Sequence, residues 1–277
     1  MVNVSTLIAS ASDKLKTVSD NPRGEARILL AHALGTKISD IIVHAEKNVS
    51  DDVIRLFDHY VLMRQTHKPI AYITGKKEFF GLSFRVNEHT LIPRPETEFI
   101  VEEIISSGKT KLLDLCSGSG CIPIAAAKNM DLTAVGIDFS DSAVNIARQN
   151  AELHELSGKV LFEVADVFEK DFFGKFEIIT SNPPYITDAD MLTLPPDVAC
   201  FEPLSALSGG VDGLKFYRRI TEIAPKNLLP DGMLVFEIGI GEGEAVANLM
   251  EKNFTNIKIK KDLAGIDRIV TGKIRRT

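Results

Sequence analysis

Residues 111–128 read KLLDLCSGSGCIPIAAAK, and this stretch decides the fold. Leu112 to Leu115 form a short apolar run that is typical of a buried strand. The next residues, Cys116 to Gly120, alternate serine with glycine, and Cys121 to Lys128 have the composition of a helix. A strand that turns through glycines directly into a helix predicts an α/β sheet in which a ligand can approach the turn closely.

The same order of strand, turn and helix continues toward the carboxyl end. The predicted strands are Leu112–Leu115, Ala134–Asp138, Val160–Ala165, Glu177–Ser181, Met233–Gly239, Ile257–Lys260 and Arg268–Ile274. The predicted helices include Ser140–His154, Leu214–Ala224 and Glu242–Lys252. This alternation predicts a parallel sheet with helices on both faces. Only LAGID separates the last two strands, which is too short for a parallel crossover, so we expect those two to pair antiparallel.

The first quarter of the chain has no strand pattern and predicts a small helical bundle. Asn21-Pro22 suits the start of a helix that runs through Leu34, and Gly35 suits its end. The stretch Pro69–Val86 has two apolar runs around Gly75 and Gly81, which predict extended segments and a hairpin. We therefore expect a substrate-docking helical domain over 1–75, a hairpin connector over 76–92 and a catalytic α/β domain over 93–277.

Composition narrows the class of protein. The 277 residues are 44% hydrophobic and 25% charged, as in a soluble globular protein. A net charge of −6 argues against the basic surface that duplex DNA or RNA requires. No apolar run approaches the roughly 20 residues that span a bilayer, and the amino terminus lacks the pattern of a secretion signal, so we expect a cytoplasmic protein. Cys116, Cys121 and Cys200 lack zinc-site spacing, and we expect buried free thiols and no metal.

The ends of the first three predicted strands suit a nucleoside-containing cofactor. Asp138 ends the second strand, where doubly wound folds place an acid against a ribose. Asp166 follows the third strand and could accept from the amine of an adenine, with Val167 beside the ring. The alternative, which three such strand ends in a row make less favoured, is that both acids cap the helices that follow them. The expected contacts in the glycine-rich turn are Cys116, Ser117, Gly118, Ser119 and Gly120. An antiparallel last pair is typical of Rossmann-like methyltransferases, which favours S-adenosylmethionine over a nicotinamide cofactor.

The tetrapeptide Asn182-Pro183-Pro184-Tyr185 follows the fourth predicted strand and points to the chemistry. An amide nitrogen is a poor nucleophile, so an enzyme that methylates it must fix its orientation. The Asn182 side-chain oxygen and the Pro183 carbonyl could each accept one N–H of a substrate NH₂. Pro183 and Pro184 stiffen the backbone, and Tyr185 could offer a flat face to a planar amide or base. Asn-Pro-Pro is also ordinary turn chemistry.

Four segments together resemble the release factor glutamine methyltransferases, the HemK/PrmC family. These are Asn182–Tyr185, the DLCSGSG turn, IPRPETE at Ile92–Glu98 and PIAYITG at Pro69–Gly75. The similarity covers nearly the whole chain. It implies a small helical domain joined by a hairpin to a seven-stranded, Rossmann-like, S-adenosylmethionine-dependent methyltransferase domain. It also implies the substrate, which is the glutamine of the Gly-Gly-Gln motif of peptide chain release factors, methylated on its side-chain amide nitrogen N5.

The family's functional positions fall on residues of this chain. Its methionine-binding turn falls on Cys116 to Gly120, its ribose-binding acid on Asp138 and its adenine-bordering residue on Val167, beside Asp166. Asn182 would serve both substrate and donor. Many members have glycine where this chain has Cys116, which fits without strain unless a positive φ is needed. An aromatic residue can stand in place of Val167. The role of Pro93–Glu98 stays open between a structural turn and a helix start, and the role of Glu237 between a site residue and a paired structural carboxylate.

Other functions remain as alternatives. A paralogous glutamine methyltransferase of a ribosomal protein shares Asn-Pro-Pro-Tyr, although that branch typically departs from Pro-Glu-Thr-Glu. Adenine-N6 DNA methyltransferases also use this tetrapeptide, because an exocyclic amine presents the same two N–H groups. A nicotinamide-dependent oxidoreductase would leave Asn182–Tyr185 unexplained. A binding module without catalysis would not need an acceptor at each strand end.

Overall fold

The computed structural model describes residues 2–275, and their contacts divide the chain into two compact units. One unit comprises residues 1–76 with 195–201, and the other comprises residues 77–194 with 202–277. No helix among the described residues is long and apolar enough to cross a membrane.

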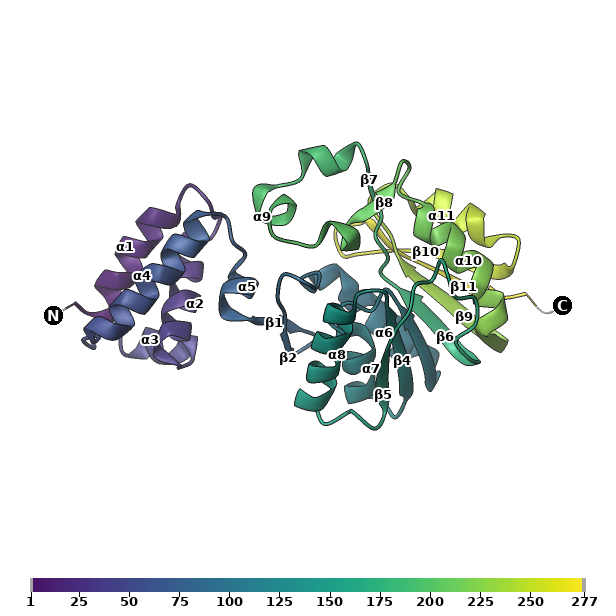
Figure 1. The fold of residues 1–277 in the computed structure, drawn as a ribbon, viewed down its shortest axis with the longest axis horizontal. Helices are drawn as coiled ribbons and strands as arrows, with labels where there is room; N and C mark the ends of the chain where they lie inside the picture. The colour runs from purple at the N-terminus through teal and green to yellow at the C-terminus, as the bar shows by residue number, and fades with distance from the viewer. Residues whose placement is uncertain (1, 276–277) are drawn as a thin grey trace. The chain divides into compact units, whose positions relative to one another are not determined.

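The first unit is built from helices. They are α1 (Val4–Leu15), α2 (Pro22–Leu34), α3 (Ile38–Val43), α4 (Asp51–Gln65), α5 (Ile70–Thr74) and α9 (Pro196–Ala199) (Figure 1). Helix α2 begins and ends as predicted, because the Asn21 side chain accepts from the Gly24 N–H at 3.2 Å and Gly35 has a φ of 63°. Leu15, Leu29 and Phe57 pack together in its core.

The predicted extended segment before Gly75 is wrong. Residues Ile70–Thr74 form helix α5, which follows Pro69 and ends at Gly75, whose φ is 69°. Its apolar residues Ala71, Tyr72 and Ile73 are buried, so the run that suggested a strand is a short helix with a buried face. The hairpin around Gly81 is confirmed, since β1 (Lys76–Phe79) and β2 (Leu82–Arg85) form a two-stranded sheet.

A seven-stranded sheet forms the centre of the second unit. Its strands are β3 (Lys111–Leu115), β4 (Thr133–Asp138), β5 (Val160–Val164), β6 (Phe176–Ser181), β9 (Leu228–Glu237), β10 (Phe254–Lys261) and β11 (Asp267–Ile274). The spatial order is β10-β11-β9-β6-β3-β4-β5. Strands β9, β6, β3, β4 and β5 pair parallel, and β11 pairs antiparallel with both β9 and β10, as the short LAGID connection predicts.

Helices cover both faces of this sheet. They are α6 (Glu98–Ser107), α7 (Cys121–Asn129) and α8 (Asp141–Leu153) on one face, and α10 (Lys215–Asn227) and α11 (Gly243–Met250) on the other (Figure 1). Neighbouring strand residues alternate between the two cores, so Leu112 packs with the first set of helices and Leu113 with the second. Short elements complete the unit: η1 (Pro95–Thr97), η2 (Asp190–Thr193), η3 (Leu204–Ala206), and the paired β7 (Ile186–Thr187) and β8 (Ser208–Gly210).

The cysteines differ in part from expectation. Cys121 is buried and Cys116 is half-buried, whereas Cys200 is exposed, so the prediction that all three thiols are buried is wrong. Cys200 directly follows the short helix α9, and none of the residues of α9 is buried.

Close packing at Gly136 in β4 leads to a stability prediction. A Cβ at this position would lie 2.4 Å from the Phe162 ring and 2.7 Å from the Ser117 hydroxyl. We expect Gly136→Ala to lower the free energy of unfolding by roughly 1–3 kcal/mol, the usual range for overpacking. Gly158→Ala is the matched control, because nothing lies within 4 Å of its added Cβ. Urea unfolding that finds the two variants equally stable would contradict this packing.

Candidate active site

A pocket lies at the carboxyl ends of the parallel strands, on either side of the point where the sheet order reverses between β3 and β6. It holds about 650 Å³, including the space at its open mouth. Its lining includes Cys116, Gly118, Asp138, Phe139, Asp166, Val167, Asn182, Pro184 and Phe216. A mostly apolar lining with a few polar groups of this kind suits a small-molecule ligand or cofactor.

The turn after β3 is held from below by a buried acid. The Asp114 carboxylate accepts from the Ser117 hydroxyl at 2.6 Å and from the Thr180 hydroxyl at 2.7 Å. Burial raises the pKa of Asp114 to about 7, and these two hydrogen bonds oppose the rise. Asp114 therefore ties the turn to the neighbouring strand β6.

Cys116 adopts a conformation that the sequence did not predict. Its φ is 60°, in the left-handed region that disfavours side chains with a Cβ, which is the one condition under which a cysteine was expected not to fit there without strain. Cys116 lines the pocket, as does Gly118 with a φ of 53°. A backbone turned this way exposes its peptide groups to a ligand.

The other three residues of the turn lie behind the pocket. Ser117 donates to Asp114, and the Ser119 carbonyl accepts from the Asn150 side chain at 2.9 Å. Gly120 has a φ of 77°, and a Cβ there would lie 2.5 Å from the Phe162 ring. These residues shape the turn and do not line the cavity.

Asp138 does not cap the helix that follows it, because Ser140 caps α8 with its own side chain, which accepts from the Ala143 N–H at 3.2 Å. One carboxylate oxygen accepts from the Gly118 N–H at 2.8 Å, and the other accepts from the Ser140 N–H at 3.0 Å. Burial raises the pKa of Asp138, while these backbone hydrogen bonds lower it. Each oxygen keeps a second lone pair, so a carboxylate that fastens two loops can still accept from a ligand hydroxyl in the pocket.

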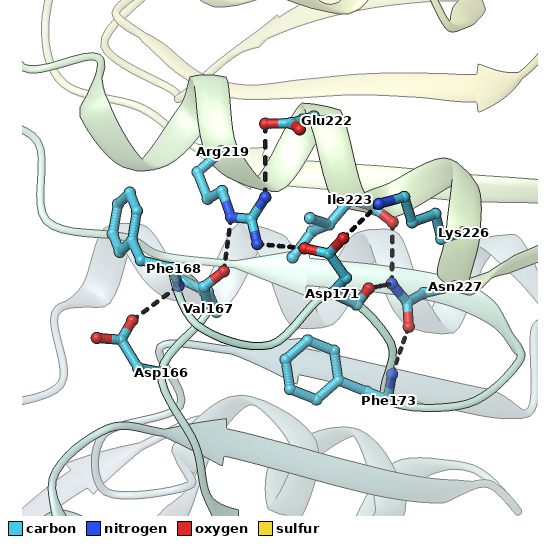
Figure 2. Close-up of polar contacts among 10 residues, drawn as sticks. All are labelled: Asp166, Val167, Phe168, Asp171, Phe173, Arg219, Glu222, Ile223, Lys226 and Asn227. Atoms are coloured by element: carbon cyan, nitrogen blue, oxygen red, sulfur yellow. Dashed lines mark hydrogen bonds and ion pairs between the residues drawn. The ribbon is translucent and has the colours of Figure 1, made fainter.

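The loop after β5 presents Asp166 and Val167 to the pocket (Figure 2). The Asp166 carboxylate accepts from the Phe168 N–H at 2.8 Å, which forms a tight turn. The Arg219 guanidinium of α10 donates to the Val167 carbonyl at 2.7 Å and pairs with Asp171. Helix α10 therefore fixes the backbone on which Val167 stands.

The far end of the same loop is also fastened to α10 (Figure 2). Asp171 forms an ion pair with Lys226, and its carbonyl accepts from the Asn227 side chain at 2.9 Å. The Asn227 side-chain oxygen accepts from the Phe173 N–H at 2.7 Å. The loop that forms this wall of the pocket is thus held by side chains of α10. This helix lies about fifty residues later in the chain.

Aromatic side chains that sequence reasoning missed also border the pocket. Phe216, at the start of α10, lines it together with Val167. The rings of Phe216 and Phe168 meet edge to face with centroids 5.1 Å apart, and the Lys215 ammonium lies 4.8 Å from the Phe168 ring. Phe216 could be recognised only from the tertiary structure, because its segment has no motif that predicts a ligand.

Asn182 lines the pocket at the end of β6, and its orientation is fixed by a hydrogen bond. Its side-chain nitrogen donates to the Thr97 hydroxyl at 3.1 Å. With Nδ2 engaged by Thr97, Oδ1 is the Asn182 atom that is left to accept from a substrate. The adjacent Ser181 hydroxyl donates to the Leu115 carbonyl at 2.7 Å, which anchors the strand end to β3.

The other three residues of the tetrapeptide differ in whether they line the pocket. Pro184 lines the pocket, and Pro183 is buried. Tyr185 is half-buried outside the lining, where its ring lies so close to Gly239 that a Cβ there would be 3.0 Å away. Burial raises the pKa of Tyr185 well above its ordinary value, so its hydroxyl stays protonated.

The segment Pro93–Glu98 supports this corner of the site. Arg94 forms an ion pair with Glu202, and Glu202 also accepts from the Ile92 N–H at 3.1 Å. The Glu98 carboxylate accepts from the Phe80 N–H at 2.7 Å, which connects the hairpin to the start of α6. The segment is both a structural turn and a helix start, and through Thr97 it also contacts Asn182.

The contacts of Arg219 lead to a test of how the pocket wall is held. Arg219→Ala removes the bond to the Val167 carbonyl and the pair with Asp171, so we expect faster hydrogen exchange of the Phe168 and Phe173 amides. Glu222→Ala is the control on the same helix, because it removes only the Arg219–Glu222 pair at 3.5 Å. Unchanged exchange in the arginine variant would show that other contacts hold this loop.

Comparison with known proteins identifies the family. Residues 6–75 match the family described as PrmC N-terminal domain, and residues 106–227 match the family described as methyltransferase domain. A release factor glutamine methyltransferase of Clostridium acetobutylicum is 38% identical, with 89% of each chain covered. One of Thermodesulfovibrio yellowstonii is 38% identical over 94% of this chain and 96% of its own. One of Bacillus subtilis is 34% identical over 94% of both chains.

Solved structures share the fold at lower identity. A methyltransferase from Pyrococcus furiosus matches with a TM-score of 0.53 and 18% identity, covering 78% of this chain and 96% of its own. The hMettl16 catalytic domain in complex with the MAT2A 3'UTR hairpin 6 matches with a TM-score of 0.58 and 15% identity, covering 81% and 82%. The sheet is that of a methyltransferase domain, and the relatives extend over nearly the whole chain. The chain belongs to the family of release factor glutamine methyltransferases.

Proposed function

We propose that this protein transfers a methyl group from S-adenosylmethionine to the side-chain amide nitrogen N5 of the glutamine in the Gly-Gly-Gln motif of peptide chain release factors. The observation that carries the proposal is the Asn182 amide, whose nitrogen donates to Thr97 at 3.1 Å. An oxygen acceptor is thereby directed to a substrate N–H. Family membership supports the same chemistry, since the curated relatives are named for it.

The pocket fits the methyl donor. Asp138 would accept from the ribose hydroxyls, and Asp166 would accept from the exocyclic amine of the adenine. The side chains of Val167 and Phe216 together form an apolar part of the pocket lining, which suits an aromatic ring. Cys116 and Gly118, the two residues of the turn that line the pocket, would meet the methionine part. When bound, S-adenosylmethionine supplies an electrophilic methyl group.

The residues after β6 would prepare the acceptor nitrogen. Asn182 Oδ1 and the Pro183 carbonyl would each accept one N–H of the glutamine amide, which leaves the lone-pair direction of the nitrogen free. Both prolines are buried, so these acceptors are held in place before the substrate binds. No base is required before transfer, because the nitrogen becomes acidic once it is alkylated and can then release a proton.

Two other substrates could use the same acceptors. An adenine amine offers the same pair of N–H groups, but the net charge of −6 does not suit a nucleic-acid partner. A glutamine of a ribosomal protein would present identical chemistry. Both are measurable outcomes of the substrate test below, and the names of the relatives favour release factors.

Substrate selection must come partly from surfaces outside the pocket, because any exposed glutamine carries the reacting group. We assign this docking role to the helices of residues 1–75. Helix α3 exposes Ile42 and Val43, which are 56% and 74% accessible, and exposed apolar side chains are suited to a protein partner. Binding energy from such remote contacts positions the reacting amide, so its loss lowers turnover as well as affinity.

We expect Val43→Asp to lower kcat/KM toward intact release factor several-fold while leaving donor affinity unchanged. Leu263→Asp is the control, since Leu263 is fully exposed in the turn between β10 and β11. Steady-state kinetics and calorimetry with S-adenosylmethionine give the two readouts. Equal kcat/KM values for both variants would remove α3 from the docking surface.

The role of Asn182 is tested by Asn182→Ala. Losing a fixed acceptor in a water-poor site should slow the chemical step by about a hundredfold or more, with a much smaller change in donor affinity. Single-turnover methylation separates the two quantities. A wild-type chemical step in this variant would contradict the mechanism.

The substrate assignment is tested by mass spectrometry of release factor incubated with enzyme and labelled donor. We expect one methyl group on the glutamine of Gly-Gly-Gln and none when that residue is replaced by glutamate, which has no nitrogen to alkylate. Ribosomal proteins and DNA in parallel reactions should stay unlabelled. Label on either of these and not on release factor would overturn the proposal.

A further inference from the structure

A carboxyl group lies buried behind Asn182 without a role in the chemistry described above. Glu237 ends β9 and is only 3% exposed. Among residues 2–275, its Oε2 atom has no hydrogen-bond partner. The nearby Tyr217 hydroxyl donates to the Glu237 backbone carbonyl at 2.9 Å and not to the carboxyl group. A polar atom buried in this way is expensive, so a functional reason for it is to be sought.

The charged groups around Glu237 do not neutralise it directly. Arg94 pairs with Glu202, and Arg268 donates to Asp262 at 2.9 Å. The titratable and charged groups that face Glu237 are Arg94 and Glu96 before α6, Cys121 of α7, Tyr185 after β6, Tyr217 of α10 and Arg268 of β11. Within the described part of the chain, residues 2–275, Glu237 is therefore not half of an ion pair.

Thr97 links Glu237 to Asn182. Its side chain lies where a hydrogen bond to Glu237 lowers the pKa of that carboxyl, and its hydroxyl oxygen accepts from Asn182 Nδ2 at 3.1 Å. Thr97 is only 2% exposed, so water does not compete for these bonds. A hydroxyl has a single proton, and if it gives that proton to a carboxylate, only its lone pairs face the asparagine.

We propose that Glu237 and Thr97 are positioning residues for Asn182, in a chain that holds the amide with Nδ2 toward Thr97 and Oδ1 toward the substrate. The proposal rests on the amide-methylating function above and deepens it. With Glu237 ionised, Thr97 must donate to the carboxylate and accept from Asn182. With Glu237 protonated, Thr97 can donate toward Asn182, which favours the flipped amide and presents NH₂ to the substrate.

This arrangement predicts that kcat increases with pH. Burial raises the pKa of Glu237 to about 7, with the Thr97 hydrogen bond opposing the rise. The ionised form is the one that orders the chain, so kcat rises as the pH increases through about 7. Asp114 has a pKa of about 7 as well, so the contribution of Glu237 must be isolated by substitution.

The first experiment varies Thr97 and measures kcat and KM. Thr97→Val keeps the shape but removes the hydroxyl, and we expect kcat to fall by about tenfold, the equivalent of one hydrogen bond, with KM for S-adenosylmethionine unchanged. Thr97→Ser retains the hydroxyl and should keep kcat within a few-fold of wild type. Equal kcat values in the valine and serine variants, with both folded and binding donor, would overturn the proposal.

The second experiment varies Glu237 and follows pH. In ¹⁵N-labelled enzyme without substrate, the Asn182 side-chain amide signal, identified by its loss in Asn182→Ala, should shift with a midpoint near the kcat transition. Glu237→Gln, which cannot ionise, should abolish both the shift and that limb of the kcat profile. If the signal is pH-independent in wild type, the positioning chain fails. That result leaves amide methylation itself intact, because Asn182→Ala tests it separately.

Discussion

The hydrogen bond from Asn182 Nδ2 to the Thr97 hydroxyl is the interaction on which the site depends. An asparagine amide has two ends of similar shape and opposite hydrogen-bonding character, and methylation of an amide requires the acceptor end to meet the substrate. Thr97 binds the donor end. The turn before α6, the ion pair of Arg94 with the buried Glu202 and the link from Glu98 to the hairpin all hold Thr97 in place.

Buried acids connect the fold to this site. Asp114 lies beneath the glycine-rich turn and Glu237 behind Thr97, and burial raises the pKa of each to about 7. Removing a carboxylate from water opposes folding whenever the group is ionised. Asp114 is on β3 and Glu237 on β9, on either side of β6, and both lie toward the carboxyl ends of these strands, where the reacting groups must be oriented. We interpret these two buried acids as groups that lower the stability of the fold and fix the geometry of the site.

Much of the fold could be predicted because its signals are local. Apolar strand runs, the helix start at Asn21-Pro22 and the short LAGID connection each depend on a few adjacent residues. Contacts between distant segments could not be predicted in this way. Thr97 and Asn182 are 85 residues apart, and Phe216 reaches the pocket from a helix without a ligand motif. The positive φ of Cys116 was also missed, because a cysteine does not signal a left-handed turn as glycine does.

The most direct test of the central claim is a crystal structure of the enzyme with S-adenosylhomocysteine and a Gly-Gly-Gln peptide. We expect the glutamine amide nitrogen to lie at hydrogen-bond distance, about 2.7–3.2 Å, from both Asn182 Oδ1 and the Pro183 carbonyl. Asn182 Nδ2 should remain on Thr97. A glutamine nitrogen that contacts neither acceptor, or an Asn182 amide turned with its nitrogen toward the peptide, would contradict it.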